Sequence, residues 1–370
     1  MLRLRIVQAE HGDCFILESG TASRPRYVLI DGGPETTYDR HLRAELASIA
    51  SAGGKLDLAM LSHVDNDHVV GLLDLLTELR QQRANGTAET IAVRALWLNA
   101  FRQTIGSGNN IEARVNALMT HAGTAARVMD ATNLAVQGIS EGHQLRLAAT
   151  TLSIPINPGI AQGLICVDGM PQPIAFGNLR VQVVGPTQRN IEELRQEWLA
   201  WLQKHEDDVA SGDPLLAAMA DRSIPNLSSI MVLARAHRKT ILLTGDGRGD
   251  HLLQGLEQAG LLDSKGKLHV NVLKVSHHGS DRNATRTFFQ QVTANTYVLS
   301  ANGLHGNPDL ATLIWVVESA RKRRKKVELV ATNKTPSTDK LLADYDPAEY
   351  YYHLAVMEPG AHAMSLELAS

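Results

Sequence analysis

Two imidazoles and two carboxylates lie within seven consecutive residues, Ser62-His63-Val64-Asp65-Asn66-Asp67-His68. Neutral imidazole nitrogen and carboxylate oxygen both suit zinc, and the mixture also suits manganese or iron. A polar loop can carry one such pair without binding anything. Four possible ligands at this density, bordered by apolar segments on both sides, favour a metal site.

The segments on either side predict how these side chains are positioned. Residues 56–61 are apolar and predict a buried strand, and residues 69–80 predict a helix. Three further groups of ligand type also follow predicted strands: Asp31, Asp246, and the pair His277-His278. Because an α/β protein gathers the ends of neighbouring parallel strands at one edge, we expect all four groups to meet there. Together they supply enough ligands for two cations about 3.5–4 Å apart.

The remaining elements are predicted from periodicity and from turn residues. Further strands are expected at residues 2–8, 14–18, 27–30, 92–98, 145–147, 151–156, 179–184, 229–234, 240–243, 270–275 and 296–300. Helices are expected at residues 41–52, 112–130 and 190–219 and from residue 309, and residues 159–177 predict a long loop. No internal repeat is found.

Composition sets limits on the class of protein. A chain of 370 residues with 44% hydrophobic and 20% charged residues can bury a sizeable core, as one large α/β domain with insertions. The net charge of −3 gives no overall attraction to nucleic acid or acidic membranes. The two cysteines, Cys14 and Cys166, have no CxxC partner, which argues against a disulfide framework and a thiolate zinc site. No apolar signal core or membrane span is found, and we expect a cytoplasmic location.

The order of these motifs resembles the metallo-β-lactamase fold hydrolases. It is most similar to the branch containing the hydrolase domain of the ComEC-type DNA-uptake proteins. The motifs that carry the resemblance are Gly12-Asp13-Cys14, Asp31-Gly32-Gly33, His63-Val64-Asp65-Asn66-Asp67-His68, Asn226-Leu227-Ser228-Ser229, Leu242-Leu243-Thr244-Gly245-Asp246 and the segment 274–280, KVSHHGS. They span residues 12 to about 308 in the family's order, and an Asp at position 65 is what that branch prefers.

The resemblance implies a four-layer αββα fold as a single domain over residues 1–370. Helical insertions are expected at about residues 101–135 and 187–224, and a C-terminal extension at about 330–370. It implies two divalent cations, Zn or Mn. His63 and Asp65 would hold one, Asp67 and His68 the other, with Asp246 bridging them. His277 or His278 would complete the first site, and the other histidine would contact substrate or orient its neighbour. Asp31 would lie behind the site and fix a histidine tautomer, or cap the turn before Gly32.

The chain departs from that branch at two places. The branch ends in Gly-His-Pro, whereas this chain has Gly306-Asn307-Pro308 with His305 just before it. Either Asn307 replaces the histidine as a weaker oxygen ligand, or His305 reaches the site. The superfamily's middle histidine also has no clear counterpart, and we interpret His143 and His121 as structural.

The resemblance implies a hydrolase that uses a hydroxide bridging two cations, with Asp67 or His278 carrying a proton to the leaving group. Phosphodiesters are the favoured substrates, which would make the chain a nuclease or phosphodiesterase acting on DNA or RNA. The run Arg321-Lys322-Arg323-Arg324-Lys325-Lys326 supports this, because consecutive cations attract a nucleic-acid backbone. The same run can also be a solvated helix end. A small-molecule ester, lactone or phosphodiester hydrolase is the alternative, and a non-catalytic binding module is a third.

Overall fold

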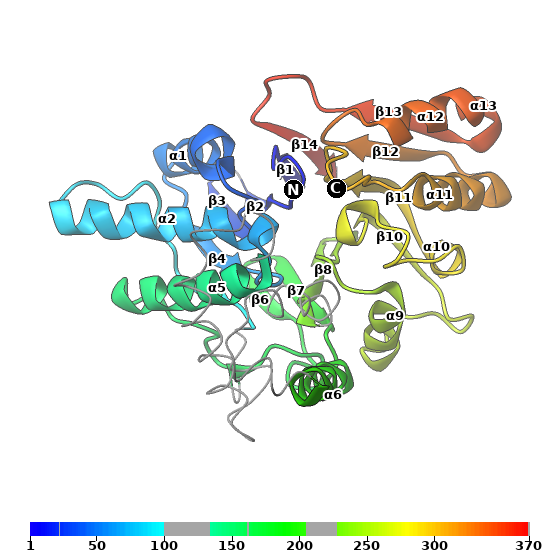
Figure 1. Cartoon of the computed structure of the whole chain (residues 1–370). Helices are drawn as coiled ribbons and strands as arrows, with labels where there is room; N and C mark the ends of the chain where they lie inside the picture. Colours follow the sequence, from blue (N-terminus) through cyan, green and yellow to red (C-terminus); the bar gives the residue numbers. More distant parts are fainter. Residues whose placement is uncertain (22, 100–133, 161–162, 205–227, 369–370) are drawn as a thin grey trace.

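Two β-sheets face each other, and helices cover the outer face of each sheet in the computed structural model (Figure 1). The structure describes residues 1–21, 23–99, 134–160, 163–204 and 228–368. Across these residues no helix has the length and apolar character needed to cross a membrane.

The first sheet has six strands in the order β14-β1-β2-β3-β4-β5. They are β14 (Ala363–Leu368), β1 (Leu2–Val7), β2 (Phe15–Thr21), β3 (Arg24–Ile30), β4 (Leu56–Met60) and β5 (Leu96–Trp97). The strands from β14 to β3 are antiparallel, whereas β3, β4 and β5 run parallel. The carboxyl ends of β3 and β4 therefore lie at the same edge.

The second sheet has eight strands in the order β13-β12-β11-β10-β9-β8-β7-β6. They are β13 (Tyr352–Val356), β12 (Val327–Ala331), β11 (Val292–Leu299), β10 (Leu268–Lys274), β9 (Lys239–Leu243), β8 (Met231–Ala236), β7 (Leu179–Gly185) and β6 (Ile174–Phe176). Strands β9 to β13 are parallel, so their carboxyl ends also share one edge.

Three apolar clusters account for the layers. One fills the space between the sheets, with side chains from β1–β4 and from β7–β10. A second packs the first sheet against α1 (Arg43–Ser51), α2 (Asn66–Asn85) and α5 (Leu134–Thr151). A third packs the second sheet against α9 (Gly249–Gln258), α10 (Phe288–Gln291), α11 (Leu310–Arg323) and α12 (Pro336–Asp344). The order of layers is helix, sheet, sheet, helix, as the sequence predicts.

Three shorter or peripheral helices complete the described part. They are η1 (Tyr38–Leu42), which leads into α1, α6 (Gln188–Lys204), and α13 (Pro347–Tyr350). Helix α6 contacts α9, because Asn190 Nδ2 donates to Gln254 Oε1 at 3.2 Å. It accounts for the first part of the helix predicted at 190–219. The rest of that helix and the helix predicted at 112–130 lie outside the described residues.

The strands predicted at 145–147 and 151–156 are wrong, because residues 134–151 form helix α5 and residues 152–155 form a turn and a short connection. Leu145, Ala148 and Ala149 of the helix and Leu152 just after it are buried and are spaced by three and four positions. That is the period of a helix with one apolar face against a sheet. Only Ile156 bridges a strand residue, Leu96, in the way an edge strand would.

The segment expected as a C-terminal extension contributes strands to both sheets. Strand β13 pairs with β12 at the edge of the second sheet, and β14 pairs with β1 of the first. Gln8 N donates to His362 O at 2.9 Å just beyond the β1–β14 ladder. The last residues therefore stabilise the strand that leads into the Gly12-Asp13 turn.

Two glycines let the turn after β3 lie directly on helix α2. A Cβ atom on Gly71 would overlap the carbonyl oxygen of Gly32, and a Cβ on Gly32 would overlap the backbone nitrogen of Leu72. The two backbones are joined by hydrogen bonds from Gly32 N to His68 O at 2.7 Å and from Gly71 N to Gly33 O at 3.1 Å. This contact places Asp31 against the first turn of α2.

We expect Gly71→Ala to lower the free energy of unfolding by about 1–3 kcal/mol, because its methyl group overpacks a backbone contact that cannot move aside. Gly169→Ala is the matched control, since its Cβ would meet no atom closer than 3.5 Å. Urea denaturation of the two variants measures the difference. Equal stability of both would contradict the assigned contact.

Candidate metal centre

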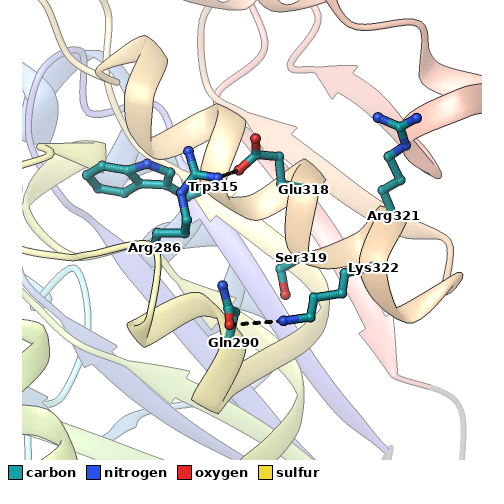
Figure 2. A pocket seen from close by; sticks show the side chains of 7 residues that line it. All are labelled: Arg286, Gln290, Trp315, Glu318, Ser319, Arg321 and Lys322. Atoms are coloured by element: carbon teal, nitrogen blue, oxygen red, sulfur yellow. Dashed lines mark hydrogen bonds and ion pairs between the residues drawn. The ribbon is translucent and has the colours of Figure 1, made fainter.

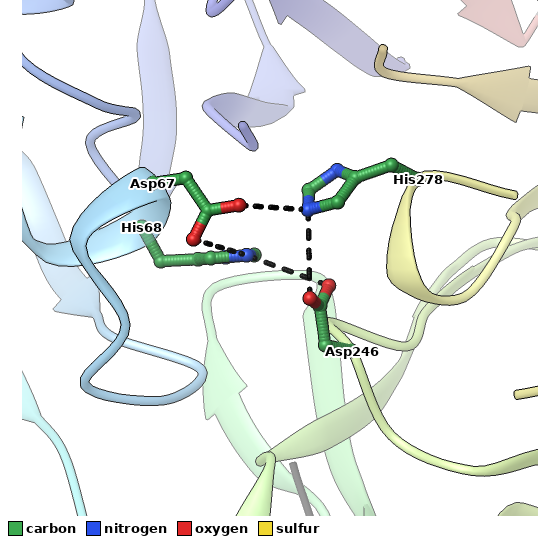
Figure 3. Close-up of side chains that lie close together, drawn as sticks. All are labelled: Asp67, His68, Asp246 and His278. Atoms are coloured by element: carbon green, nitrogen blue, oxygen red, sulfur yellow. Dashed lines mark ion pairs between the residues drawn. The ribbon is translucent and has the colours of Figure 1, made fainter. Parts of the chain in front are cut away.

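The groups predicted to meet at the strand ends do so, at the edge where both sheets present the carboxyl ends of parallel strands (Figure 3). Asp31 follows β3, and His63 and Asp65 follow β4. Asp246 follows β9, and the short turn η4 (His277–Gly279) follows β10. Asp67 and His68 lie in the first turn of α2, which begins at Asn66, three residues earlier than predicted.

One group of possible ligands consists of Asp67, His68, Asp246 and His278. His278 Nε2 lies 3.0 Å from Asp67 Oδ2 and 3.4 Å from Asp246 Oδ2. His68 Nε2 lies 3.4 Å from Asp246 Oδ1 and 3.7 Å from Asp67 Oδ1. The four side chains come from three different elements and point toward one another (Figure 3). A single cation could therefore contact all four.

A second group, His63, Asp65 and Asp67, adjoins the first. His63 Nε2 is 3.5 Å from Asp65 Oδ2 and 3.7 Å from Asp246 Oδ2. Asp67 belongs to both groups, and Asp246 has an oxygen near the histidines of both. Two carboxylates shared between adjoining groups are what a pair of cations separated by a few ångströms requires.

Hydrogen bonds at the opposite ring nitrogens orient the histidines. His68 Nδ1 lies 2.9 Å from Asp31 Oδ2, and His278 Nδ1 lies 2.9 Å from the carbonyl oxygen of Ser300. An acceptor oxygen at Nδ1 requires the proton there, which leaves the Nε2 lone pair directed at the centre in the neutral ring. Asp31 thus lies where it could fix the tautomer of His68.

Several buried atoms of the two groups have no hydrogen-bond partner among the described residues. They are His63 Nε2, His68 Nε2, His278 Nε2, Asp65 Oδ1 and Asp246 Oδ1. Buried polar atoms of folded proteins are nearly always paired. Because all five belong to the two ligand groups and are nitrogen or oxygen donors, divalent cations would satisfy them together. The residues present therefore fit a metal centre.

Opposite charges in the centre shift the pKa values of its members. Burial alone would lower the pKa of His68 and of His278, but Asp246 and the neighbouring carboxylates raise both well above the ordinary value. Burial would raise the pKa of Asp246, but His278, His277 and His68 hold it well below its usual range. In the metal-free protein, protons on His68 and His278 therefore balance part of the negative charge.

Lys274 and Asp13 also belong to this centre, although we did not predict a role for either. Lys274 is fully buried, contacts the Asp13 carboxylate and donates from Nζ to the carbonyl oxygen of Gly245 at 2.8 Å. Its Nζ is 3.6 Å from Asp246 Oδ1. No signal in the sequence marks its burial, because β10 also carries His269 and Asn271 and a lysine at a strand end is ordinarily exposed.

From the sequence, His277 or His278 is expected to complete the site formed by His63 and Asp65. The structure places His278 in the other group, with Asp67 and His68. The chain turns sharply there, with both histidines at positive φ, and His278 points inward. The His277 side chain is 30% exposed, with Nδ1 2.8 Å from Asn283 Oδ1 and Nε2 3.6 Å from Asp246 Oδ2. It therefore lies at the rim of the centre.

Other predicted residues fall outside the two groups. His305 is exposed, and its ring lies edge-on to His11, with centroids 5.9 Å apart. His143 is exposed on α5, and His121 lies outside the described residues. A role for Asn307 stays a prediction.

Protein side chains crowd the backbone at Gly245 and Gly247, on either side of Asp246. A Cβ on Gly245 would approach the Ser62 side chain to 2.9 Å, and a Cβ on Gly247 would overlap the side chain of Met231. These contacts pack the Asp246 turn against the end of β4 and against β8.

The basic run at the end of α11 does not form one continuous surface. Arg321 pairs with Glu349 at 2.5 Å and lies over the Tyr350 ring, whereas Lys322 Nζ lies 3.4 Å from Gln290 Oε1. Figure 2 shows these two side chains pointing away from each other. Lys322 lines a hollow between α10 and α11 that also includes Arg286 and Trp315.

In the comparison with protein families, residues 10–107 match the Metallo-beta-lactamase superfamily. This stretch contains Asp13, Asp31 and the His63–His68 cluster, so the likeness covers the ligand-type residues of the first sheet. The ComEC-type branch stays a prediction.

Comparison with solved structures gives remote likenesses, each at 11% identity and covering 99% of this chain. One is the metallo-beta-lactamase fold protein YhfI from Bacillus subtilis, with a TM-score of 0.38 over 100% of that chain. Another is a diphosphatase from the PhnP family, with a TM-score of 0.40 over 98% of its chain. A third is zinc-bound PqqB from Methylobacterium extorquens, with a TM-score of 0.41 over 100% of its chain. No curated protein matches significantly. Likenesses this remote carry no activity over to this chain.

We expect the affinity for Zn²⁺ or Mn²⁺ to rise with pH between about 6 and 8. The raised pKa values mean that protons on His68 and His278 stabilise the metal-free fold below the ordinary histidine pKa of about 6.5. The stability that these protons give to the metal-free fold is lost as pH rises through the raised pKa. A cation that binds must displace the same protons. Chelator-competition titrations should show roughly a tenfold gain in affinity per pH unit for each proton displaced. An affinity that does not change over this range would contradict the assigned groups.

Proposed function

We propose that the chain is a metal-dependent hydrolase that cleaves phosphodiester bonds, as a nuclease or phosphodiesterase. The observation that carries the proposal is the pair of adjoining ligand groups that share Asp67 and contact Asp246. A pair of cations at such a spacing can hold both the attacking and the leaving oxygen of an in-line displacement at phosphorus.

Each side chain has a role that follows from its position. His63, Asp65, Asp67, His68, Asp246 and His278 would hold the cations. Divalent cations bound there supply Lewis-acid polarisation of a phosphoryl oxygen and activation of water. Asp31 keeps the Nε2 lone pair of His68 aimed inward by accepting from Nδ1.

Proton transfer is best assigned to groups at the rim. His278 Nε2 is directed at Asp67 and Asp246, which suits a ligand more than a proton carrier. His277 remains as a group that can exchange a proton with a leaving oxygen, since its side chain is 30% exposed. Asp67 is shared by both ligand groups and suits a ligand for the same reason as His278, so we assign proton transfer to His277 in place of Asp67 and His278.

The donor set supports a phosphodiester substrate more than an ester. Three carboxylates and three imidazoles form the two groups, and such an oxygen-rich mixture suits Mn²⁺ as well as Zn²⁺. The hollow beside α11 is lined by Trp315, Arg286 and Lys322, of which Arg286 pairs with Glu318, and it offers an aromatic side chain and the Lys322 cation to a strand of nucleic acid (Figure 2).

We expect Asp246→Asn and His278→Gln to lower metal content and to reduce cleavage of bis(p-nitrophenyl) phosphate by more than about a hundredfold, because each removes a ligand. His143→Gln is the matched control, since His143 is exposed on α5 and outside the ligand groups. Elemental analysis and initial rates with Zn²⁺, Mn²⁺ or Mg²⁺ test this.

The same experiment separates the alternatives. Cleavage of esters or lactones without cleavage of the phosphodiester or of single-stranded DNA would favour the small-molecule hydrolase. A protein that binds no divalent cation would favour the binding module and contradict the proposal.

We expect replacement of Lys322, Lys325 and Lys326 by Gln to weaken binding of single-stranded DNA and to flatten its salt dependence. Each lost phosphate contact lowers the slope of log K against log salt by about 0.7. The control carries the same change of charge elsewhere, at the exposed Lys55, Lys265 and Lys267. Equal effects of both triple variants would show that the basic run is only a solvated helix end. Fluorescence anisotropy measures both.

A further inference from the structure

A lysine is buried behind the two ligand groups. Lys274 is the last residue of β10 and has no solvent exposure. Its ammonium contacts the Asp13 carboxylate, donates to Gly245 O at 2.8 Å and lies 3.6 Å from Asp246 Oδ1. A lysine is almost never fully buried unless paired, because an isolated charge in the interior is strongly unfavourable.

The partner of Lys274 is itself joined to the ligand groups. Asp13 is fully buried, and its backbone N–H donates to Asp67 O at 3.1 Å. Asp13 Oδ1 lies 3.5 Å from His278 Nδ1, and Asp13 Oδ2 lies 3.9 Å from His68 Nδ1. The Asp13–Lys274 pair therefore lies behind both histidines of the first ligand group, on the side away from the position of a cation.

Lys274 offsets part of the negative charge of the centre. The ligand groups and the residues behind them contain five carboxylates: Asp13, Asp31, Asp65, Asp67 and Asp246. Lys274 supplies one positive charge, and with neutral histidines four negative charges remain. Two divalent cations balance these four, whereas without Lys274 one negative charge would be left over in a largely buried site.

We propose that Lys274 is a fixed internal counter-charge that, with Asp13, sets the net charge of the centre so that two divalent cations neutralise it. The inference rests on the proposed metal-dependent function. Lys274 is a positioning residue, since it reaches the cations only through Asp246 and Asp13. Charges this close in a site of reduced dielectric interact far more strongly than in water, so one unit of charge changes metal affinity measurably.

Variants of Asp13 and Lys274 distinguish an effect of net charge on metal affinity from an effect of side-chain packing. Asp13→Asn makes the centre one unit less negative, whereas Asp13→Asn combined with Lys274→Met removes one charge of each sign and leaves the net charge as in the native protein. We expect Asp13→Asn to weaken binding of both Zn²⁺ and Mn²⁺ by about ten- to a hundredfold, the range seen when groups behind metal ligands are altered. The double variant should bind within about threefold of native.

The measurement is chelator competition for each metal alone, with stoichiometry by elemental analysis and thermal unfolding of the metal-free proteins. Should the Met-containing double variant fail to fold, Asp13→Asn with Lys274→Gln keeps polar atoms at both positions and the same net charge. A double variant that loses as much affinity as Asp13→Asn would overturn the proposal, because the pair would then act through its contacts and not its charge. Native-like affinity of Asp13→Asn would overturn it as well.

Metal binding by the native protein distinguishes failure of the proposed hydrolase from failure of the role assigned to Lys274. Native protein that binds no divalent cation would remove the metal centre and the proposed hydrolase together. Native protein that binds two cations, with a double variant that does not, would remove only the role assigned to Lys274.

Discussion

The carboxylate of Asp31 holds together the three segments on which the centre depends. It accepts from Ser62 N at 2.6 Å and Ser62 Oγ at 2.7 Å, and it lies 2.9 Å from His68 Nδ1. One side chain thus joins the end of β3 to the end of β4 and to the first turn of α2. Asp31 can take this position because Gly32 and Gly71 allow its turn to lie on the helix. That contact adds to the backbone hydrogen bonds from Gly32 N to His68 O and from Asp13 N to Asp67 O in orienting the His63–His68 cluster.

The centre concentrates charges of both signs where little water can reach them. Its carboxylates and histidines come from both sheets, and the first sheet alone would hold a surplus of negative charge. Lys274 and Asp246 belong to the second sheet, whereas Asp13, Asp31, Asp65 and Asp67 belong to the first. Attraction between these sets adds to the apolar packing between the sheets. A site built this way is held rigidly before any cation arrives, which favours selective binding.

Much of the centre could be predicted because its residues follow apolar strands in short, dense motifs. His63 to His68, Asp246 and His277-His278 are recognisable from type and position alone. The Asp13–Lys274 pair could not be, since its members are far apart in sequence and each is ambiguous by itself. Assigning His278 to the correct group required the turn at η4, where two consecutive histidines at positive φ point in different directions. The end of helix α5 was mistaken for strands because Thr150 and Thr151 favour strands locally, although tertiary packing imposes the helical period.

The pairing of β1 with β14 bears on the order of events during folding. Leu2 is aligned with Leu368, so the first sheet is completed by residues at opposite ends of the described chain. Contacts between such distant residues form late. Residues 63–68 are synthesised long before Asp246 and His278, and a nascent chain holds only part of the ligand set. The complete set forms only when both sheets have docked, so the folded protein, and not the emerging chain, selects its metal.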